Sequence, residues 1–152
     1  MKSRLIIFAL LLSGIWAKAQ NEKVESYFHN KGVLLLANCA HPAGTYESGT
    51  YYVDDQSVIV NIVYTGGART KLRLDRMGPG FSKVTVLYND DVVPAFAFIK
   101  VVSNAILSQY KNSDDKDELI RELENSLNKQ LSDWSGADWA LLLVNLDYFS
   151  NN

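Results

Sequence analysis

The sequence predicts an α+β fold, in which an antiparallel β-meander of about four to five strands carries C-terminal helices packed on one face. The first observation behind this prediction is a series of β-rich runs, separated by short turn sequences, between residues 50 and 88. The second is helical periodicity after residue 91. Strands that come first and helices that follow are typical of an α+β layer rather than of an alternating parallel fold.

The N-terminus has the three parts of a secretory signal peptide. Two basic side chains within residues 2–4 precede the apolar run 5–12, and Ala-Lys-Ala at residues 17–19 is a small-x-small cleavage sequence. We therefore expect residues 1–19 to be a signal peptide and residues 20–152 to form a single globular α+β domain. This domain is expected in the periplasm or outside the cell.

The mature chain is expected to be acidic and to lack a membrane span. The full sequence has 15 Lys and Arg against 17 Asp and Glu, and removal of Lys2, Arg4 and Lys18 brings the formal charge from -2 to -5. An acidic domain argues against general nucleic-acid binding, which needs surplus Lys and Arg. The apolar leader run is too short to span a membrane, which takes about 20 residues.

Two elements are predicted between the leader and the meander. Asn21 is expected to cap a short helix that extends through His29, with Gly32 as its stop. The compact apolar run 33–38 is followed by a turn cluster at residues 41–44, and this run is predicted to be a buried strand.

The meander itself is predicted from four β-rich runs. These runs are residues 50–53, 57–65, 68–75 and 81–88, with turns at residues 54–56, 66–67 and 77–80. Both alternate sets of side chains in the second run are largely apolar, which favours a central strand. Gly66 and Gly67 supply the positive φ angles that a two-residue hairpin needs.

Two helices are predicted after the meander. Asp91 is expected to cap the first, which has Pro94 in its first turn and extends through Tyr110. The second opens at residues 113–115 and runs until Gly136 ends it. Its apolar stripe recurs every four residues, at Leu119, Leu123, Leu127 and Leu131.

The last segment, residues 139–149, is apolar throughout, so periodicity does not distinguish a buried helix from a closing strand. Ser135 and Asp138 resemble a capping box, which favours the helix. Aromatic residues in this part of the chain, if exposed, would stack on sugar rings, but their spacing along apolar segments favours the core. They are Trp134, Trp139, Tyr148 and Phe149.

Cys39 and His41 are candidates for a thiolate–imidazole pair, because they would lie on the same side of an extended strand. We favour a simpler interpretation, in which Cys39 is buried and His41 belongs to a turn. Addition of His29 would give three metal ligands, but the spacing matches none of the common zinc patterns. No metal site, cofactor or catalytic residue is therefore predicted.

Two pairs of adjacent carboxylates raise the possibility of acid–base chemistry. Asp54 and Asp55 fall in a predicted turn, and Asp90 and Asp91 fall at a predicted helix start. Aspartate is common at such places because its side chain bonds local amides, which favours a structural role. Neither a serine nucleophile motif nor a phosphate-binding glycine loop occurs in the sequence.

Basic residues mark one face of the third β-rich run. Arg69, Lys71 and Arg73 occupy alternate positions, so they share a face of their strand, and Lys83 on the next run is expected to join them. In an acidic domain such a face suits an anionic ligand. The alternative is a solvated face whose charges discourage aggregation.

Two classes of function remain. The first is a small exported, non-catalytic binding or interaction module of the cell envelope or extracellular space, whose partner is a protein or an anionic glycan. The second is a small secreted hydrolase whose site forms only in three dimensions, around Cys39 and His41 or the turn carboxylates. Cys39 distinguishes them, because an open pocket with a neighbouring histidine would favour the enzyme.

Overall fold

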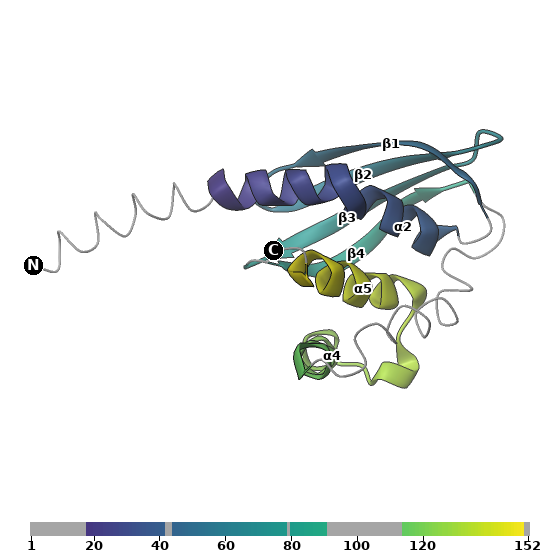
Figure 1. The fold of residues 1–152 in the computed structure, drawn as a ribbon. Coiled ribbons are helices and arrows are strands. Elements are labelled where there is room, and N and C mark those ends of the chain that lie inside the picture. The colour runs from purple at the N-terminus through teal and green to yellow at the C-terminus, as the bar shows by residue number, and fades with distance from the viewer. Residues whose placement is uncertain (1–17, 42–43, 79, 91–113, 151–152) are drawn as a thin grey trace, which may run out of the picture.

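A four-stranded antiparallel sheet and a layer of helices make up the fold (Figure 1). The computed structural model describes residues 18–41, 44–78, 80–90 and 114–150. The strand order β1-β2-β3-β4 is that of a meander, which confirms the predicted fold class. The predicted helix from Asp91 through Tyr110 lies outside the described residues, as do residues 1–17 of the predicted leader.

The strands lie where the β-rich runs predicted them. They are β1 (Tyr46–Val53), β2 (Ser57–Tyr64), β3 (Arg69–Met77) and β4 (Gly80–Asn89). The first strand begins earlier than predicted, at Tyr46 instead of Thr50. As expected from its two apolar faces, β2 is an inner strand with a partner on each side.

The β2–β3 hairpin differs from the prediction in the length of its turn. The backbone N–H of Tyr64 donates to the carbonyl of Ala68 at 2.8 Å, so three residues, not two, connect the paired ends. Gly66 and Gly67 do have the expected positive φ angles, +99° and +95°. The extra residue sets the register, which pairs Val60 with Leu72.

This register gives the sheet one buried face and one open face. Side chains of the buried face, which we call the core face, come from alternate positions of β2 and β3 and from two positions of β4 on either side of an irregularity in its pairing. They are Val58, Val60, Ile62 and Tyr64; Thr70, Leu72 and Leu74; Phe81 and Val84. The opposite side, which we call the outer face, carries the other alternate residues. Helices α2 (Val33–Ala40) and α5 (Gly136–Ser150) pack on the core face, so the two faces have different solvent environments (Figure 1).

The N-terminal part of the structure corrects two predictions. Helix runs from residue 18 to residue 27, continues through the π-helix η1 (Phe28–Gly32) and ends in α2 (Val33–Ala40). Gly32 does not stop it, because its φ of -63° and ψ of -40° are helical. The apolar run 33–38 is therefore helical and not a strand.

Packing explains both differences. A Cβ atom on Gly32 would lie 2.7 Å from side-chain atoms of Phe28 and Tyr27. The absence of a side chain at Gly32 therefore lets these two aromatic rings pack against the helix backbone. In α2, the buried residues Val33, Leu36, Ala37 and Ala40 recur at helical spacing. A short apolar run satisfies the helical and the extended pattern equally, and contacts with the sheet decide between them.

Asn21 also has a different role from the predicted cap. It lies inside the helix, where its Nδ2 donates a hydrogen bond of 2.7 Å to Oδ1 of Asp55. Its Oδ1 accepts a hydrogen bond from Nη1 of Arg76, which also donates to the Asp54 carbonyl at 2.6 Å. Asn21 thus ties the N-terminal helix to the β1–β2 turn and to the end of β3.

The predicted helix between residues 113 and 136 is shorter than expected. The structure has α4 (Asp114–Leu127), followed by the 3-10 helix η3 (Leu131–Asp133). The chain leaves α4 at Asn128, whose φ of +54° is left-handed, and asparagine is a common residue just past a helix end in this conformation. Leu123 is buried, as its position in the leucine stripe predicted.

Residues 139–149 form a helix, as the capping box favoured. The element is α5 (Gly136–Ser150). Asp138 Oδ2 accepts from the Ser135 backbone N–H at 2.9 Å, and Ser135 Oγ accepts from the Asp138 N–H at 3.3 Å. This reciprocal pair satisfies amides that the first turn of a helix leaves free.

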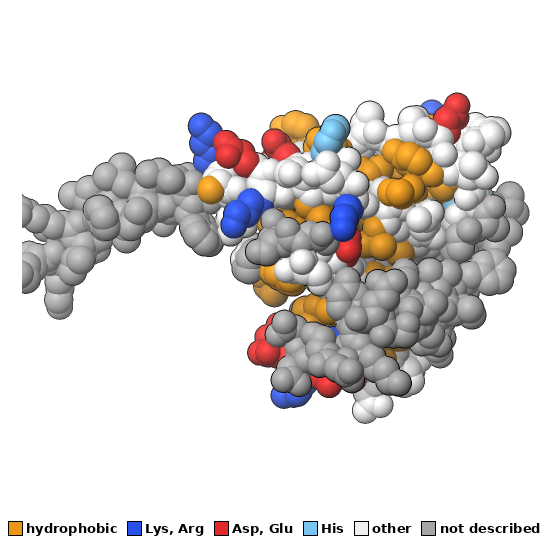
Figure 2. All heavy atoms as spheres, in the orientation of Figure 1, with side chains coloured by type: hydrophobic (Ala, Val, Ile, Leu, Met, Phe, Trp, Pro, Cys, Tyr) orange, Lys and Arg blue, Asp and Glu red, His pale blue; other side chains and the backbone are white. Residues whose placement is uncertain are grey.

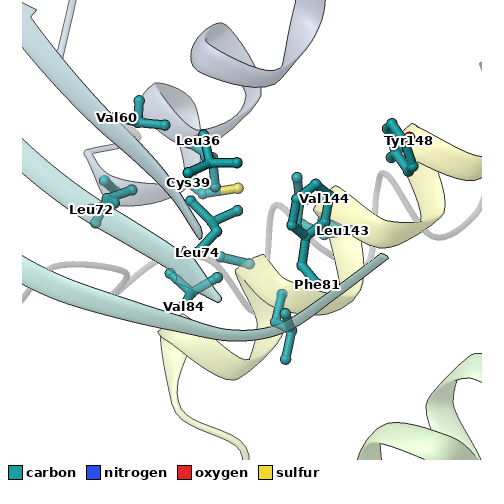
Figure 3. Packing of buried hydrophobic residues seen from close by; sticks show 14 of the residues in the cluster. Leu36, Cys39, Val60, Leu72, Leu74, Phe81, Val84, Leu143, Val144 and Tyr148 are labelled. Carbon is teal, nitrogen blue, oxygen red and sulfur yellow. The ribbon is translucent and has the colours of Figure 1, made fainter. Parts of the chain in front are cut away.

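The core lies between the core face of the sheet, α2 and α5 (Figure 3). Leu143 and Val144 of α5 face Leu74 of β3 and Leu36 of α2 across it. Trp134, Trp139 and Tyr148 are buried, which agrees with the core role favoured for them, whereas Phe149 is 45% exposed. In α5 the side chains from Trp139 to Leu146 are all buried.

One buried polar side chain connects α5 to the edge strand β4. Asn145 is 1% exposed, and its Oδ1 accepts from the Phe81 backbone N–H at 2.9 Å. Its Nδ2 donates to the carbonyls of Phe81, at 3.0 Å, and of Leu141, at 2.9 Å. The carboxamide therefore pairs with both main-chain groups of Phe81, much as a neighbouring strand would.

Candidate functional site

The four basic residues singled out from the sequence lie on the outer face. Arg69, Lys71 and Arg73 alternate with buried residues of β3. Lys83 of β4 is paired with Asp75 of β3, next to them. On the helix-bearing side shown in Figure 2, by contrast, basic and acidic side chains are interspersed.

Strand register arranges the outer face in rows that cross the strands. The middle row, which we call the central row, contains one residue from each strand: Thr50, Asn61, Lys71 and Tyr88. The row on one side includes Val63 and Arg69, and the row on the other includes Tyr52, Ile59, Arg73 and Thr85. Lys71 thus lies on an inner strand with a polar neighbour on each side.

Arg69 is engaged with Asp90 and Tyr88. Its Nε lies 3.6 Å from Asp90 Oδ2, and its guanidinium carbon lies 5.7 Å from the centroid of the Tyr88 ring. The Tyr88 hydroxyl donates to Asp90 Oδ1. Hydrogen bonds from the Tyr88 hydroxyl and the Arg69 amide, together with the Arg69 charge, lower the pKa of Asp90, so this carboxylate is ionised at neutral pH.

Asp75 lies close to the two other cations. Arg73 Nε is 3.3 Å from Asp75 Oδ1, although it donates no hydrogen bond to it. On the other side, Lys83 is the cross-strand partner of Asp75. Three of the four basic residues therefore have a carboxylate beside them, which reduces their attraction for a further anion.

Lys71 differs from these three. It is exposed, and within the described ranges no hydrogen bond or ion pair involves its side chain. An open depression of about 360 Å³ lies over this part of the outer face, and its lining includes Asn61, Val63, Arg69, Lys71 and Tyr88. The depression therefore combines an uncompensated positive charge, a carboxamide and an aromatic ring.

Sequence reasoning missed Thr50, Asn61 and Tyr88. Each comes from a different strand, so only strand register brings them to Lys71. Counting outward from the β2–β3 turn would place Asn61 beside Lys71 if the turn has three residues. A two-residue turn would place Asn61 opposite Leu72 instead, so the missing signal was the turn length.

Cys39 does not form the pair proposed for the hydrolase alternative. It is 1% exposed and lies among apolar side chains that include Leu36, Val60 and Leu74 (Figure 3). Burial raises the pKa of its thiol to about 12, so the thiolate, the nucleophilic form, is scarce at neutral pH. His41 packs its ring edge-on against Tyr64, with centroids 5.0 Å apart.

His29, Cys39 and His41 were considered as a possible set of three metal ligands, and no metal site was predicted from them. His29 packs against Tyr51, with ring centroids 6.3 Å apart. Among the described residues, no three His, Cys, Asp or Glu side chains are grouped closely enough to hold a metal ion.

The carboxylate pairs have structural contacts. Asp54 Oδ1 accepts hydrogen bonds of 2.8 Å from the backbone N–H groups of Gln56 and Ser57, and these two bonds lower the pKa of Asp54. Asp55 accepts from Asn21. Asp90 binds Arg69 and Tyr88, as described above, and Asp91 lies outside the described residues.

A second hollow of about 320 Å³ lies between the β3–β4 turn, α4 and α5. Its wall is mainly apolar and includes Met77, Leu119, Leu123 and Phe149. Glu122 also lines the hollow. This is where the exposed Phe149 is found. The hollow contains none of the basic residues of the outer face.

None of the helices in the described part of the chain combines the length and the apolar character that a membrane span requires. No family model matches the chain, and no curated protein and no solved structure matches it either. The fold and the outer face define the class, a small α+β domain with an open sheet face that carries basic residues. A function is therefore argued from that face.

Proposed function

We propose that this protein is a small exported, non-catalytic binding module of the cell envelope or extracellular space, which holds an anionic ligand on the outer face of its sheet. The observation that carries the proposal is Lys71, an exposed cation at the centre of that face with no ion-pair partner among the described residues. The opposite face of the sheet forms the core, so of the two sheet faces the outer one is open to a ligand.

Electrostatics support this assignment. The chain as a whole has a formal charge of -2, yet Arg69, Lys71, Arg73 and Lys83 gather on the outer face, where Asp75 and Asp90 are the carboxylates beside them. A local surplus of cations on an acidic protein attracts anions to that place and not to the rest of the surface. The hydrolase alternative gains no support from Cys39, whose thiol is enclosed.

Charge reversal on the outer face provides the test. We expect Arg69→Glu combined with Lys71→Glu to abolish retention of the mature protein on columns that carry a sulfated glycan or a uronic-acid polymer. Wild-type protein should be retained at low salt and released as ionic strength rises, because surface charges are screened beyond about 8 Å at 0.15 M salt.

Lys23→Glu combined with Arg121→Glu is the matched control. Both positions are exposed and belong to helices, and this pair changes the formal charge by the same amount. The control should be retained like the wild type. Equal retention of wild type and the outer-face variant would discard the proposal.

The proposed export route includes cleavage of residues 1–19. Lys18 and Ala19 are exposed, whereas Asn21 donates a hydrogen bond to Asp55 and Val24 is buried. Cleavage before Gln20 would therefore preserve those contacts. Mass spectrometry of protein from the native source should find a chain that begins at Gln20, and a chain that still carries Met1 would contradict export by this route.

A further inference from the structure

We infer that the ligand of the central row is a carboxylated saccharide of the uronic-acid type. This inference rests on the proposed function and names the chemical class of its ligand. It starts from the charge balance at Lys71, because the cations on either side of it already face Asp90 and Asp75. One uncompensated ammonium group matches one carboxylate better than a cluster of anionic groups.

The two flanking carboxylates argue against more highly charged ligands. Asp90 and Asp75 lie beyond Lys71 in opposite directions along β3, beside Arg69 and Arg73. A densely sulfated chain laid across this face would bring further anions close to them, and like charges repel at such distances. Phosphate is typically held by free Arg forks or free backbone N–H groups. Both arginines here already have carboxylate neighbours.

The neighbours of Lys71 are suited to a sugar ring. Asn61 offers a carboxamide that both donates and accepts hydrogen bonds, and Thr50 adds a hydroxyl beside it. Tyr88 is 45% exposed, and Asp90 and Arg69 hold its ring in place. A fixed aromatic ring next to polar groups offers a flat apolar surface together with hydrogen-bond partners.

An acidic peptide would also carry carboxylates, but the position of Lys71 disfavours it. Extended peptides usually bind a sheet by main-chain hydrogen bonds at a free edge. Lys71 lies on β3, an inner strand whose main chain is paired with β2 and β4. The groups available above it are side chains, which matches recognition of hydroxyl and carboxylate groups.

The test is calorimetric titration of the mature protein with a uronic-acid tetrasaccharide. We expect wild type to bind this tetrasaccharide. The affinity should fall about tenfold or more in Lys71→Met, because a hydrogen bond to a charged group is lost. The same fall is expected when wild type is titrated with the carboxyl-reduced tetrasaccharide. Asn61→Ala should weaken binding several-fold. Lys23→Met, an exposed control on the N-terminal helix, should bind like wild type.

Two further titrations separate this inference from the proposed function. If a sulfated glycan that contains no uronic acid binds through Lys71 and the uronic-acid tetrasaccharide does not, the anion-binding function stands and the uronic-acid assignment is wrong. If a poly-glutamate peptide binds as tightly as the tetrasaccharide, the saccharide assignment is wrong as well. If no anionic ligand binds, both proposals fail.

Circular dichroism should show that each variant keeps the wild-type fold, since all substituted side chains are exposed.

Discussion

Replacement of Asn145 by leucine is expected to lower the free energy of unfolding by about 3–5 kcal/mol. Leucine has a similar volume, so the loss comes from hydrogen bonds more than from packing. The backbone N–H and carbonyl of Phe81 would lose their partners. The Phe81 side chain is buried and β4 packs against α5, and a buried amide or carbonyl without a partner is costly.

Chemical denaturation measures this effect, and hydrogen exchange locates it. The Phe81 amide should lose protection selectively if Asn145 is what holds it. Asn38→Leu is the control, because Asn38 is exposed on α2, and it should change stability by no more than about 0.5 kcal/mol. A cost below about 1 kcal/mol for Asn145→Leu would show that α5 and β4 do not depend on this pairing.

Alkaline pH should destabilise the protein through Cys39. Burial raises the pKa of this thiol from 9.0 to about 12 in the folded state, so above pH 9 the unfolded chain releases the proton and the folded one keeps it. The thiol contribution is therefore fully present below pH 9 and is lost as pH rises towards 12. Three units correspond to about 4 kcal/mol at most.

Comparison of wild type with Cys39→Ala isolates this contribution. At neutral pH the alanine variant should be less stable by about 1–2 kcal/mol, because a small cavity replaces the sulfur. Above pH 9 the difference should shrink and then reverse, since alanine has no proton to lose. Other groups that titrate at alkaline pH, including Tyr148 with its raised pKa, are common to both proteins. A difference that stays constant from pH 7 to 11 would contradict the buried thiol.

Local signals in the sequence were sufficient for the strands and for the last helix. Apolar residues at both alternate sets of positions in the second run indicated an inner strand, and β2 has a partner on each side. Turn residues located the hairpins. The capping box at Ser135 and Asp138 identified α5 even though its apolar residues have no clear period. Strand patterns, turns and helix caps depend on residues that are close together in the chain, so they can be predicted from the sequence alone.

The N-terminal helix shows where local signals were not enough. Gly32 ordinarily favours a helix end, but here the close approach of Tyr27 and Phe28 requires glycine inside a helix. The apolar run after it was compatible with a strand or with a helix. Packing against the sheet decided between the two, and that packing involves residues distant in the sequence.

For the candidate site, the sequence by itself determined that Arg69, Lys71 and Arg73 share a face, because side chains alternate along a strand. Tertiary structure decided the rest. A three-residue turn sets the β2–β3 register, which places Asn61 beside Lys71, and the pairing of β3 with β4 adds Tyr88. Carboxylates from other positions then neutralise the flanking arginines. Which cation remains uncompensated is therefore a property of the folded sheet and not of any one strand.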